Sequence, residues 1–256
     1  MKKIISILMI AMLAIALTAC GSDDKDKKAS DSKDKAKTSQ AENQKKQEEQ
    51  MKEMQKKMDA QKVDDKKVVA TVNNEKIIGK DYNMALSSSQ MQMQQMGQDP
   101  SSKDAAKQIK DQTVESLIGQ SLILQDAEKK GYKASDKEVN DQLSQTKKQY
   151  KDEKKFAAAL KQANLSESDV KGQIADGIAS QKYIEKEVPA DKVSDKEIQD
   201  YYNKYAKQST GKDQKAPKLE EVKPQIKQQL EQQKQQEKLV KKVQDLKKNA
   251  KIDVKI

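Results

Sequence analysis

The chain of 256 residues contains no histidine, no tryptophan and a single cysteine, Cys20. The missing histidines exclude Ser-His-Asp and Cys-His catalysis as well as histidine metal sites. One cysteine alone cannot form an intramolecular disulfide. We therefore expect no catalytic residue, no metal site and no cofactor. A hydrolase built on serine and lysine, or on carboxylates, is the only enzyme class left open, and no spacing of residues supports it.

Arginine is also missing, so all 51 basic residues are lysines, and aromatic residues make up only 3% of the chain. Nucleic-acid binding favours arginine forks and aromatic stacking platforms, so we expect no nucleic-acid partner. The net charge is +10, and removing a leader that holds Lys2 and Lys3 leaves +8. This charge favours salt-dependent binding to anionic cell-wall polymers.

The N-terminus has the pattern of a lipoprotein leader. An apolar run over residues 4–17 follows two lysines and is shorter than the roughly 20 residues that a membrane-spanning helix needs. It ends in Leu-Thr-Ala-Cys at 17–20, which resembles the bacterial lipobox, where a diacylglyceryl group carrying fatty acids such as palmitate is attached to the cysteine. We predict that residues 1–19 are a signal peptide and that Cys20 anchors the protein to the extracytoplasmic face of the cell membrane. The alternative is a plain signal peptide with an incidental cysteine.

Residues 20–66 are rich in Ser, Asp, Lys, Gln and Glu, so we predict a disordered tether after the anchor. Its distal part carries Met51, Met54 and Met58 at helical spacing. A helix there could dock on the following domain or remain solvated, and the sequence leaves both open for the segment 45–62.

Apolar character begins at Val68, where β-branched residues on both sides of Asn73-Asn74 predict a small hairpin. The last residues alternate as a strand does, with isoleucine or valine at 252, 254 and 256. A lone terminal strand needs a partner. We therefore expect the C-terminus to return to the N-terminal hairpin and close a small sheet.

The densest apolar segment outside the leader spans residues 114–131 and has helical periodicity on more than one face. It predicts a central helix that begins near Ser101-Ser102 and ends before Gly131. Gly119 in its middle costs about 1 kcal/mol relative to alanine, which is tolerable if another backbone approaches closely.

Further amphipathic helices follow the central one. Capping boxes at Ser135/Glu138 and Ser194/Glu197, and a similar start at Ser166/Asp169, predict where three of them begin. Residues 207–217 read as a turn-rich linker, after which a long Gln/Lys-rich helix carries an apolar stripe from Leu219 onward. The expected fold class is mainly α with a small β-sheet.

Together, the lipobox, Val-Ala-Thr-Val-Asn-Asn-Glu-Lys-Ile at 69–77 and the central helix with Ser-Asp-Lys-Glu-Val behind it resemble the SurA N-terminal domain family, specifically the PrsA-type foldase lipoproteins of Gram-positive bacteria. The resemblance covers roughly residues 66–256. It implies a discontinuous chaperone domain formed by residues 67–206 and 218–256, which cradles unfolded secreted proteins outside the cell.

One departure concerns catalysis. PrsA-type proteins carry a parvulin prolyl-isomerase domain of about a hundred residues where this chain has only the 207–217 linker. Parvulin sites also rely on histidines, which this chain lacks. We therefore expect a holdase or foldase without prolyl-isomerase activity.

The candidate client-binding residues combine flexible thioethers, which suit promiscuous apolar contact, with a group of tyrosines. They are Met91, Met93, Met96, Tyr201, Tyr202 and Tyr205. The alternative is that these side chains pack the helical core. An adaptor or structural lipoprotein that binds one extracytoplasmic partner also stays open, as does self-association.

Overall fold

The computed structural model describes residues 48–206 and 217–256, except for the side chains at 205 and 206. The chain divides into two compact units, residues 1–52 and 53–256. Of the first unit only residues 48–52 are described, and they are helical. The predicted signal peptide, Cys20 and positions 207–216 of the predicted linker lie outside the described residues.

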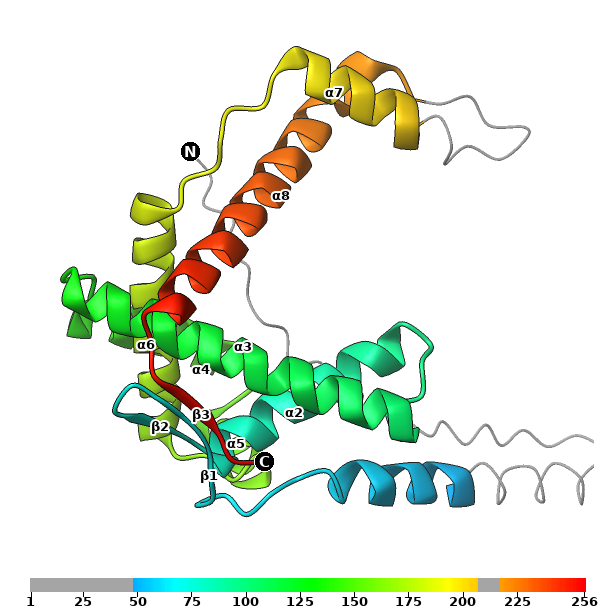
Figure 1. Ribbon diagram of the computed structural model, residues 1–256. Coiled ribbons are helices and arrows are strands. Elements are labelled where there is room, and N and C mark those ends of the chain that lie inside the picture. The colour runs from blue at the N-terminus through cyan, green and yellow to red at the C-terminus, as the bar shows by residue number, and fades with distance from the viewer. Residues whose placement is uncertain (1–47, 207–216) are drawn as a thin grey trace, which may run out of the picture. The chain divides into compact units, whose positions relative to one another are not determined.

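The second unit contains a three-stranded antiparallel sheet in the order β2-β1-β3 (Figure 1). Strands β1 (Val68–Val72) and β2 (Glu75–Ile78) form the predicted hairpin, in which Asn73 has a φ of 56°. Asparagine tolerates this left-handed conformation better than most residues, which suits it to a two-residue turn. Strand β3 (Ile252–Val254) pairs with the free edge of β1. The prediction that the C-terminus returns to the hairpin is confirmed.

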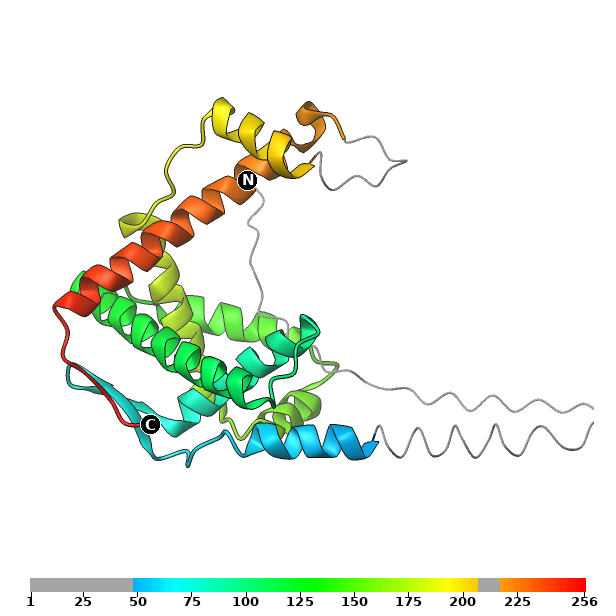
Figure 2. The same cartoon turned by 45° about the vertical axis from the view of Figure 1, so that its right-hand side comes forward.

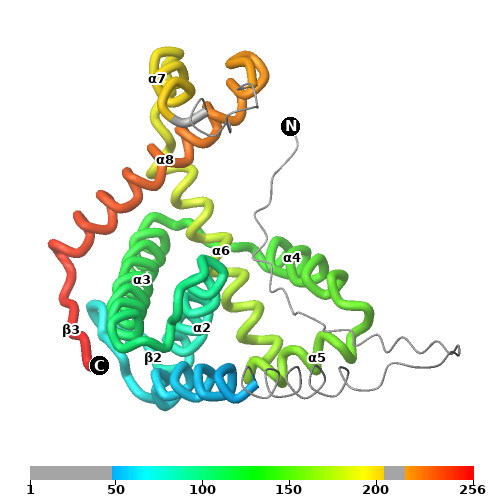
Figure 3. The backbone as a smooth tube through the Cα atoms, turned by 90° about the vertical axis from the view of Figure 1, so that its right-hand side faces the viewer, coloured from blue at the N-terminus to red at the C-terminus, as the bar shows by residue number. Residues whose placement is uncertain are grey.

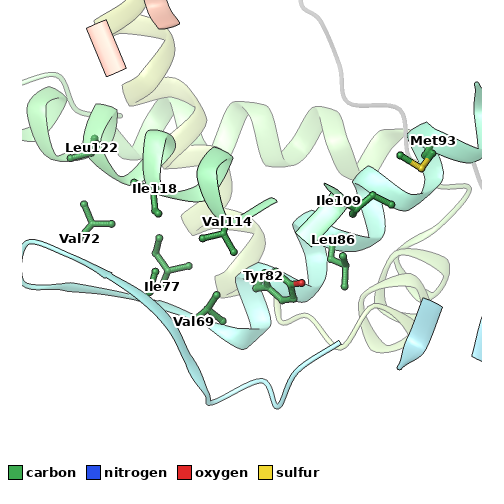
Figure 4. Packing of buried hydrophobic residues seen from close by; sticks show 11 residues of the cluster. Val69, Val72, Ile77, Tyr82, Leu86, Met93, Ile109, Val114, Ile118 and Leu122 are labelled. Carbon is green, nitrogen blue, oxygen red and sulfur yellow. The ribbon is translucent and has the colours of Figure 1, made fainter. Parts of the chain in front are cut away.

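Helices α2 (Gly79–Gln95) and α3 (Lys103–Lys129) lie side by side and pack on the sheet (Figure 3). Helix α3 begins where the sequence predicts, because the Ser102 hydroxyl accepts a hydrogen bond from the backbone N–H of Ala105. Figure 4 shows side chains of α2, α3 and the hairpin that meet in the main core. The fully or largely buried members of this core are Val69, Ala70, Val72, Ile77, Tyr82, Leu86, Met93, Ile109, Val114, Ile118 and Leu122.

A second face of α3 contributes to another apolar cluster, as the two-sided pattern of this helix predicts. Ile123 and Ala127 pack there with Tyr183 of α6 (Glu167–Glu187). Val243 of α8 (Leu219–Lys248) joins them. An ideal Cβ on Gly119 would lie 3.3 Å from Val243 Cγ1. The close approach expected at Gly119 is therefore made by a side chain and not by a second backbone.

The structure describes the distal part of the segment predicted as a tether. Residues up to 59 are helical, and the segment from 53 onward belongs to the second compact unit. Val63 packs against the main core, and its backbone N–H and C=O both bond to the Asn83 side chain, at 3.0 and 2.8 Å. The spacing of Met51, Met54 and Met58 left docking of the segment 45–62 open, whereas the contacts of Val63 with Asn83 are backbone–amide hydrogen bonds that composition does not reveal.

Helices α4 (Asp136–Lys148) and α5 (Glu153–Gln162) lie between α3 and α6 in sequence, and α4 packs on α6. Both predicted capping boxes in this region are present, with Ser135 and Glu138 starting α4 and Ser166 and Asp169 starting α6. Each pair satisfies two backbone N–H groups that a helix start leaves unpaired.

Helix α7 (Asp195–Tyr201) also begins at its predicted capping box and continues into a π-helical turn, η1 (Tyr202–Ala206). Both pack on the N-terminal part of α8 around Ile198 and Ile226. Helix α8 runs unbroken through Pro224, which the sequence placed near its first turn, and its C-terminal end leads into β3 (Figure 2). The predicted fold class, mainly α with a small sheet, is confirmed.

Candidate client-binding surface

The C-terminal half of α2 carries the three methionines that the sequence predicts for client contact. The structure buries one of them and exposes the other two. Met91 and Met96 are exposed, with 49% and 62% of their surfaces accessible. Met93 is buried in the main core, with 8% accessible. Met93 therefore fits the alternative of core packing, and its inclusion among the accessible residues is corrected.

Helical geometry explains this division. Tyr82, Leu86 and Met93 follow one another along the face of α2 that points into the core, as Figure 4 shows. The same face includes Gln90, which is buried although polar. Met91 is two residues from Met93 and so points away from this face.

The stretch of sequence that carries these methionines is uncharged, in a chain of which 36% of residues are charged. No Lys, Asp or Glu occurs between Asp81 and Asp99. Serine and glutamine fill the stretch, and the hydroxyls of Ser87, Ser88 and Ser89 are bonded to carbonyls of the preceding turn. An uncharged surface with exposed thioethers can contact apolar segments without selecting for the charge of their neighbours.

The tyrosines form part of a small core at the other end of the second unit. Tyr202 is buried beside Ile198 and Ile226, and its hydroxyl donates a hydrogen bond of 2.6 Å to the carbonyl of Pro217. Tyr201 is partly buried against the same cluster. The side chain of Tyr205 lies outside the described residues. The structure therefore does not bring these tyrosines together with the methionines of α2, and Tyr202 is corrected to a core residue.

A groove between α4, α5 and α6, of about 500 Å³, was not predicted from the sequence. Its walls alternate in charge, and Lys147 forms a 2.8 Å ion pair across it with Glu167. The residues that line it are Asn140, Leu143, Ser144, Lys147, Lys148, Asp152, Glu153, Glu167 and Lys171. No motif marks this groove, because its residues come from three helices that look like ordinary solvated surfaces.

A polar junction fixes α3, α6 and α8 to one another behind these surfaces. The Tyr183 hydroxyl donates to Asp126, and Lys242 of α8 lies 3.3 Å from the same carboxylate. Burial raises the pKa of Asp126, but the hydrogen bonds from Tyr183 and Lys242 outweigh burial and hold the pKa below its usual value. Burial also raises the pKa of Tyr183, so its hydroxyl stays a donor. Sequence reasoning identified no member of this junction, because none stands in a recognisable motif.

Within the described part of the chain, no cluster of acidic residues has an arrangement that could hold a metal ion. None of the helices in residues 48–206 and 217–256 is long and apolar enough to cross a membrane.

Residues 59–184 match the family model of the SurA-like N-terminal domain. This part of the chain is similar to SurA-like N-terminal domains. It contains the hairpin, α2 and α3, together with α4, α5 and most of α6. The SurA-like domain thus includes the methionine surface of α2 and the groove between α4 and α6, whereas α7, α8 and β3 lie beyond the matched residues.

Curated relatives that match between 54% and 79% of this chain are foldases by name. The foldase protein PrsA of Clostridium botulinum strain Hall is 26% identical over 214 residues, which cover 79% of this chain and 54% of the relative. The foldase protein PrsA of Caldanaerobacter subterraneus subsp. tengcongensis is 27% identical over 146 residues, 54% of this chain and 42% of the relative. The chain spans about half the length of the curated relatives it matches. The resemblance predicted from the sequence is confirmed for the SurA-like domain.

Proposed function

We propose that this protein is a lipid-anchored extracytoplasmic chaperone that holds unfolded secreted proteins and assists their folding without prolyl-isomerase activity. The observation that carries the proposal is the SurA-like N-terminal domain, found in a chain whose relatives are named foldases. Cys20 would hold the lipid, and the chain between Cys20 and the second unit would be the tether. Anionic cell-wall polymers would be secondary, charge-driven partners.

The uncharged methionine surface of α2 supports a role in binding without chemistry. Met91 and Met96 present flexible, polarisable side chains to solvent, and the surrounding glutamines can donate or accept hydrogen bonds. Such a surface can adapt to apolar segments of many sequences, which is what a holdase requires.

The segment between η1 and α8 supports the proposal that isomerase activity is absent. Only residues 207–216 separate the described parts of the chain here. The hydrogen bond between Tyr202 and Pro217, 15 residues apart, closes the base of this segment. A stretch of this length cannot form a compact domain without disulfides or a metal site, and the chain has no second cysteine and no histidine to provide them.

The experiment is an aggregation assay with the full chain in lipid nanodiscs and empty nanodiscs as the blank. The protein should suppress aggregation of several unrelated unfolded proteins at near-stoichiometric ratios, and it should leave the cis–trans exchange of a proline peptide at the uncatalysed rate. The double variant Met91→Ser/Met96→Ser should weaken suppression. The matched control Val240→Ser, which removes an exposed apolar side chain from α8, should not.

Two outcomes of these assays would contradict parts of the proposal. Measurable acceleration of prolyl exchange would overturn the claim that isomerase activity is absent. Failure with unrelated clients, combined with saturable binding to one extracytoplasmic protein, would favour the adaptor that the sequence left open.

A further inference from the structure

The C-terminal half of α2 already holds a segment of the same chain, at Gln90 and Gln94 beside the exposed Met91 and Met96. This segment, residues 53–61, comprises the end of a helix that spans residues 48–59 and the turn that follows it. Met58, in the last turn of that helix, is only 7% exposed. The Gln94 side chain donates to Met58 Sδ, and the Gln90 side chain donates to the Met58 carbonyl, both at 3.3 Å. The Met58 carbonyl also accepts the backbone N–H of Gln61 at 3.1 Å, so the Gln90 side chain adds a second hydrogen bond at the end of this helix.

This occupant is attached lightly, whereas the chain just after it is attached firmly. Residues 53–61 are held by Met58 and by side-chain amides, including Gln61, which donates to the Pro100 carbonyl at 3.0 Å. The ion pair of Lys57 with Glu53 lies within the segment itself. By contrast, Asp65 accepts backbone and side-chain hydrogen bonds from Lys80, Asn83 and Asn164. The chain can therefore separate from α2 up to residue 61 while the part from 63 onward stays in place.

Resting on the proposed chaperone function, we propose that residues 87–96 of α2 form a helix-binding surface with exchangeable occupants. In the free protein it holds residues 53–61, and during chaperone action it holds a short amphipathic helix from the client in their place. The resident segment indicates the chemistry of that client helix. A methionine-like side chain in its last turn would fill the place of Met58 and accept a hydrogen bond from Gln94 at its sulfur. A backbone carbonyl of that turn would accept a hydrogen bond from Gln90.

The absence of charge on this part of α2 widens the range of such helices. The resident helix carries both lysines and acidic residues near Met58, and residues 82–98 carry no charge. The one charge at the end of this stretch, Asp99, interacts with Lys57 of the resident helix. A client helix is therefore selected first by its apolar side chain and its last-turn carbonyl. The exposed Met91 and Met96 belong to the same half of α2.

Hydrogen–deuterium exchange tests the proposal on the unmodified full chain in lipid nanodiscs, with reduced, carboxymethylated α-lactalbumin as the unfolded client. Adding the client should speed exchange at the backbone amides of residues 55–61 and slow it in α2 around residues 90–96. The amides of Val63 and Lys67, whose hydrogen bonds stay intact, are the internal control and should not change.

A variant gives an independent readout. Met58→Ser weakens the resident contact, so the client should bind more tightly, by up to about tenfold if the segment is seated nine-tenths of the time. Met54→Ser, on the same helix at a half-exposed position, is the matched control and should have a smaller effect. Circular dichroism should show that both variants keep the helical content of the parent.

The outcomes separate this inference from the function on which it rests. If no client binds to parent or variant, the proposed chaperone function fails. If the client binds while residues 55–61 keep their exchange rates, exchange of occupants is refuted and the chaperone function stands. Unchanged or weaker client binding by a folded Met58→Ser variant would also refute the exchange of occupants and leave the chaperone function standing.

Discussion

A Cβ on Gly79 would lie 1.9 Å from the carbonyl oxygen of Asp64 and 3.0 Å from Val63 Cγ2. Gly79 opens α2, and its backbone N–H donates to the Lys67 carbonyl at 2.7 Å. The segment over residues 63–67 can cross the start of α2 only because residue 79 has no side chain. The contact explains why the second unit begins before the hairpin and includes residues that look like tether.

The first prediction concerns Gly79→Ala. Because a backbone oxygen must move, the substitution should lower the free energy of unfolding by about 1–3 kcal/mol or more. Gly177→Ala is the matched control in α6, where a Cβ would meet nothing within 4 Å. It should raise the free energy of unfolding by about 0.5–1 kcal/mol, because mid-helix glycine is unfavourable. Urea denaturation followed by circular dichroism measures both, and equal effects would contradict this assignment of Gly79.

The second prediction concerns the C-terminal strand. Deleting residues 250–256 removes the partner of β1 and the partly buried Ile252 and Ile256 from the main core. We expect one cooperative melting transition at a lower temperature, because the sheet and helices share that core. Asp253→Ala, which removes only an exposed side chain from β3, should leave the transition in place. An unchanged melting curve after the deletion would mean that the strand does not close the domain.

The third prediction concerns acid stability. A hydrogen bond from Lys182 and bonds from Ser135 lower the pKa of Glu138 from 4.5 to about 2. A carboxyl whose pKa is lower in the folded state stabilises the fold above its unfolded pKa, and this contribution is lost as the pH falls. The loss should therefore occur between about pH 4.5 and pH 2.

Glu138→Gln tests this window, since glutamine cannot titrate. The parent should be more stable than the variant at neutral pH, and the difference should shrink between pH 4.5 and pH 2 in unfolding experiments. The control is Asp141→Asn, which breaks the exposed ion pair with Lys137. It should change the free energy of unfolding little at any pH. The prediction would be contradicted if the free energies of unfolding of the parent and of Glu138→Gln differed by the same amount down to pH 2.

The fourth prediction concerns the anchor. If Cys20 carries the lipid, Cys20→Ser should move the protein from the membrane fraction into the medium or leave an unprocessed precursor. Fractionation with immunoblotting measures both results. Ser22→Ala, two residues beyond the cysteine, is the control and should remain in the membrane fraction. Normal processing with full membrane retention in Cys20→Ser would rule out a lipoprotein.

Sequence patterns predicted most of the fold because local chemistry determines it. The capping serines at 102, 135, 166 and 194 start their helices as expected. Asn73 lies in the hairpin turn, and the C-terminal strand β3 pairs with β1. The caps and the turn each depend on a few adjacent residues with a fixed backbone requirement. The pairing of β3 with β1 followed instead from the need of a lone strand for a partner.

The site could be predicted only in part. Periodicity cannot tell which methionine of a helix faces inward until the partner helix is known, so Met93 was grouped with Met91 and Met96. The docking of residues 63–67 depends on Asn83 and on the bare backbone at Gly79, and neither leaves an apolar pattern. The groove between α4, α5 and α6 arises from helix packing alone and has no sequence signature.

The pairing of β1 with β3 also sets an order for folding. The backbone N–H of Lys251 bonds to the Asn73 side chain, 178 residues earlier in the chain. A chain is synthesised from its N-terminus, so β1 must wait for almost the whole protein before its second edge is covered. During that interval the strand presents unpaired N–H and C=O groups that other extended chains can bind. A nascent copy of this protein therefore exposes this edge of β1 until residues 252–254 have emerged.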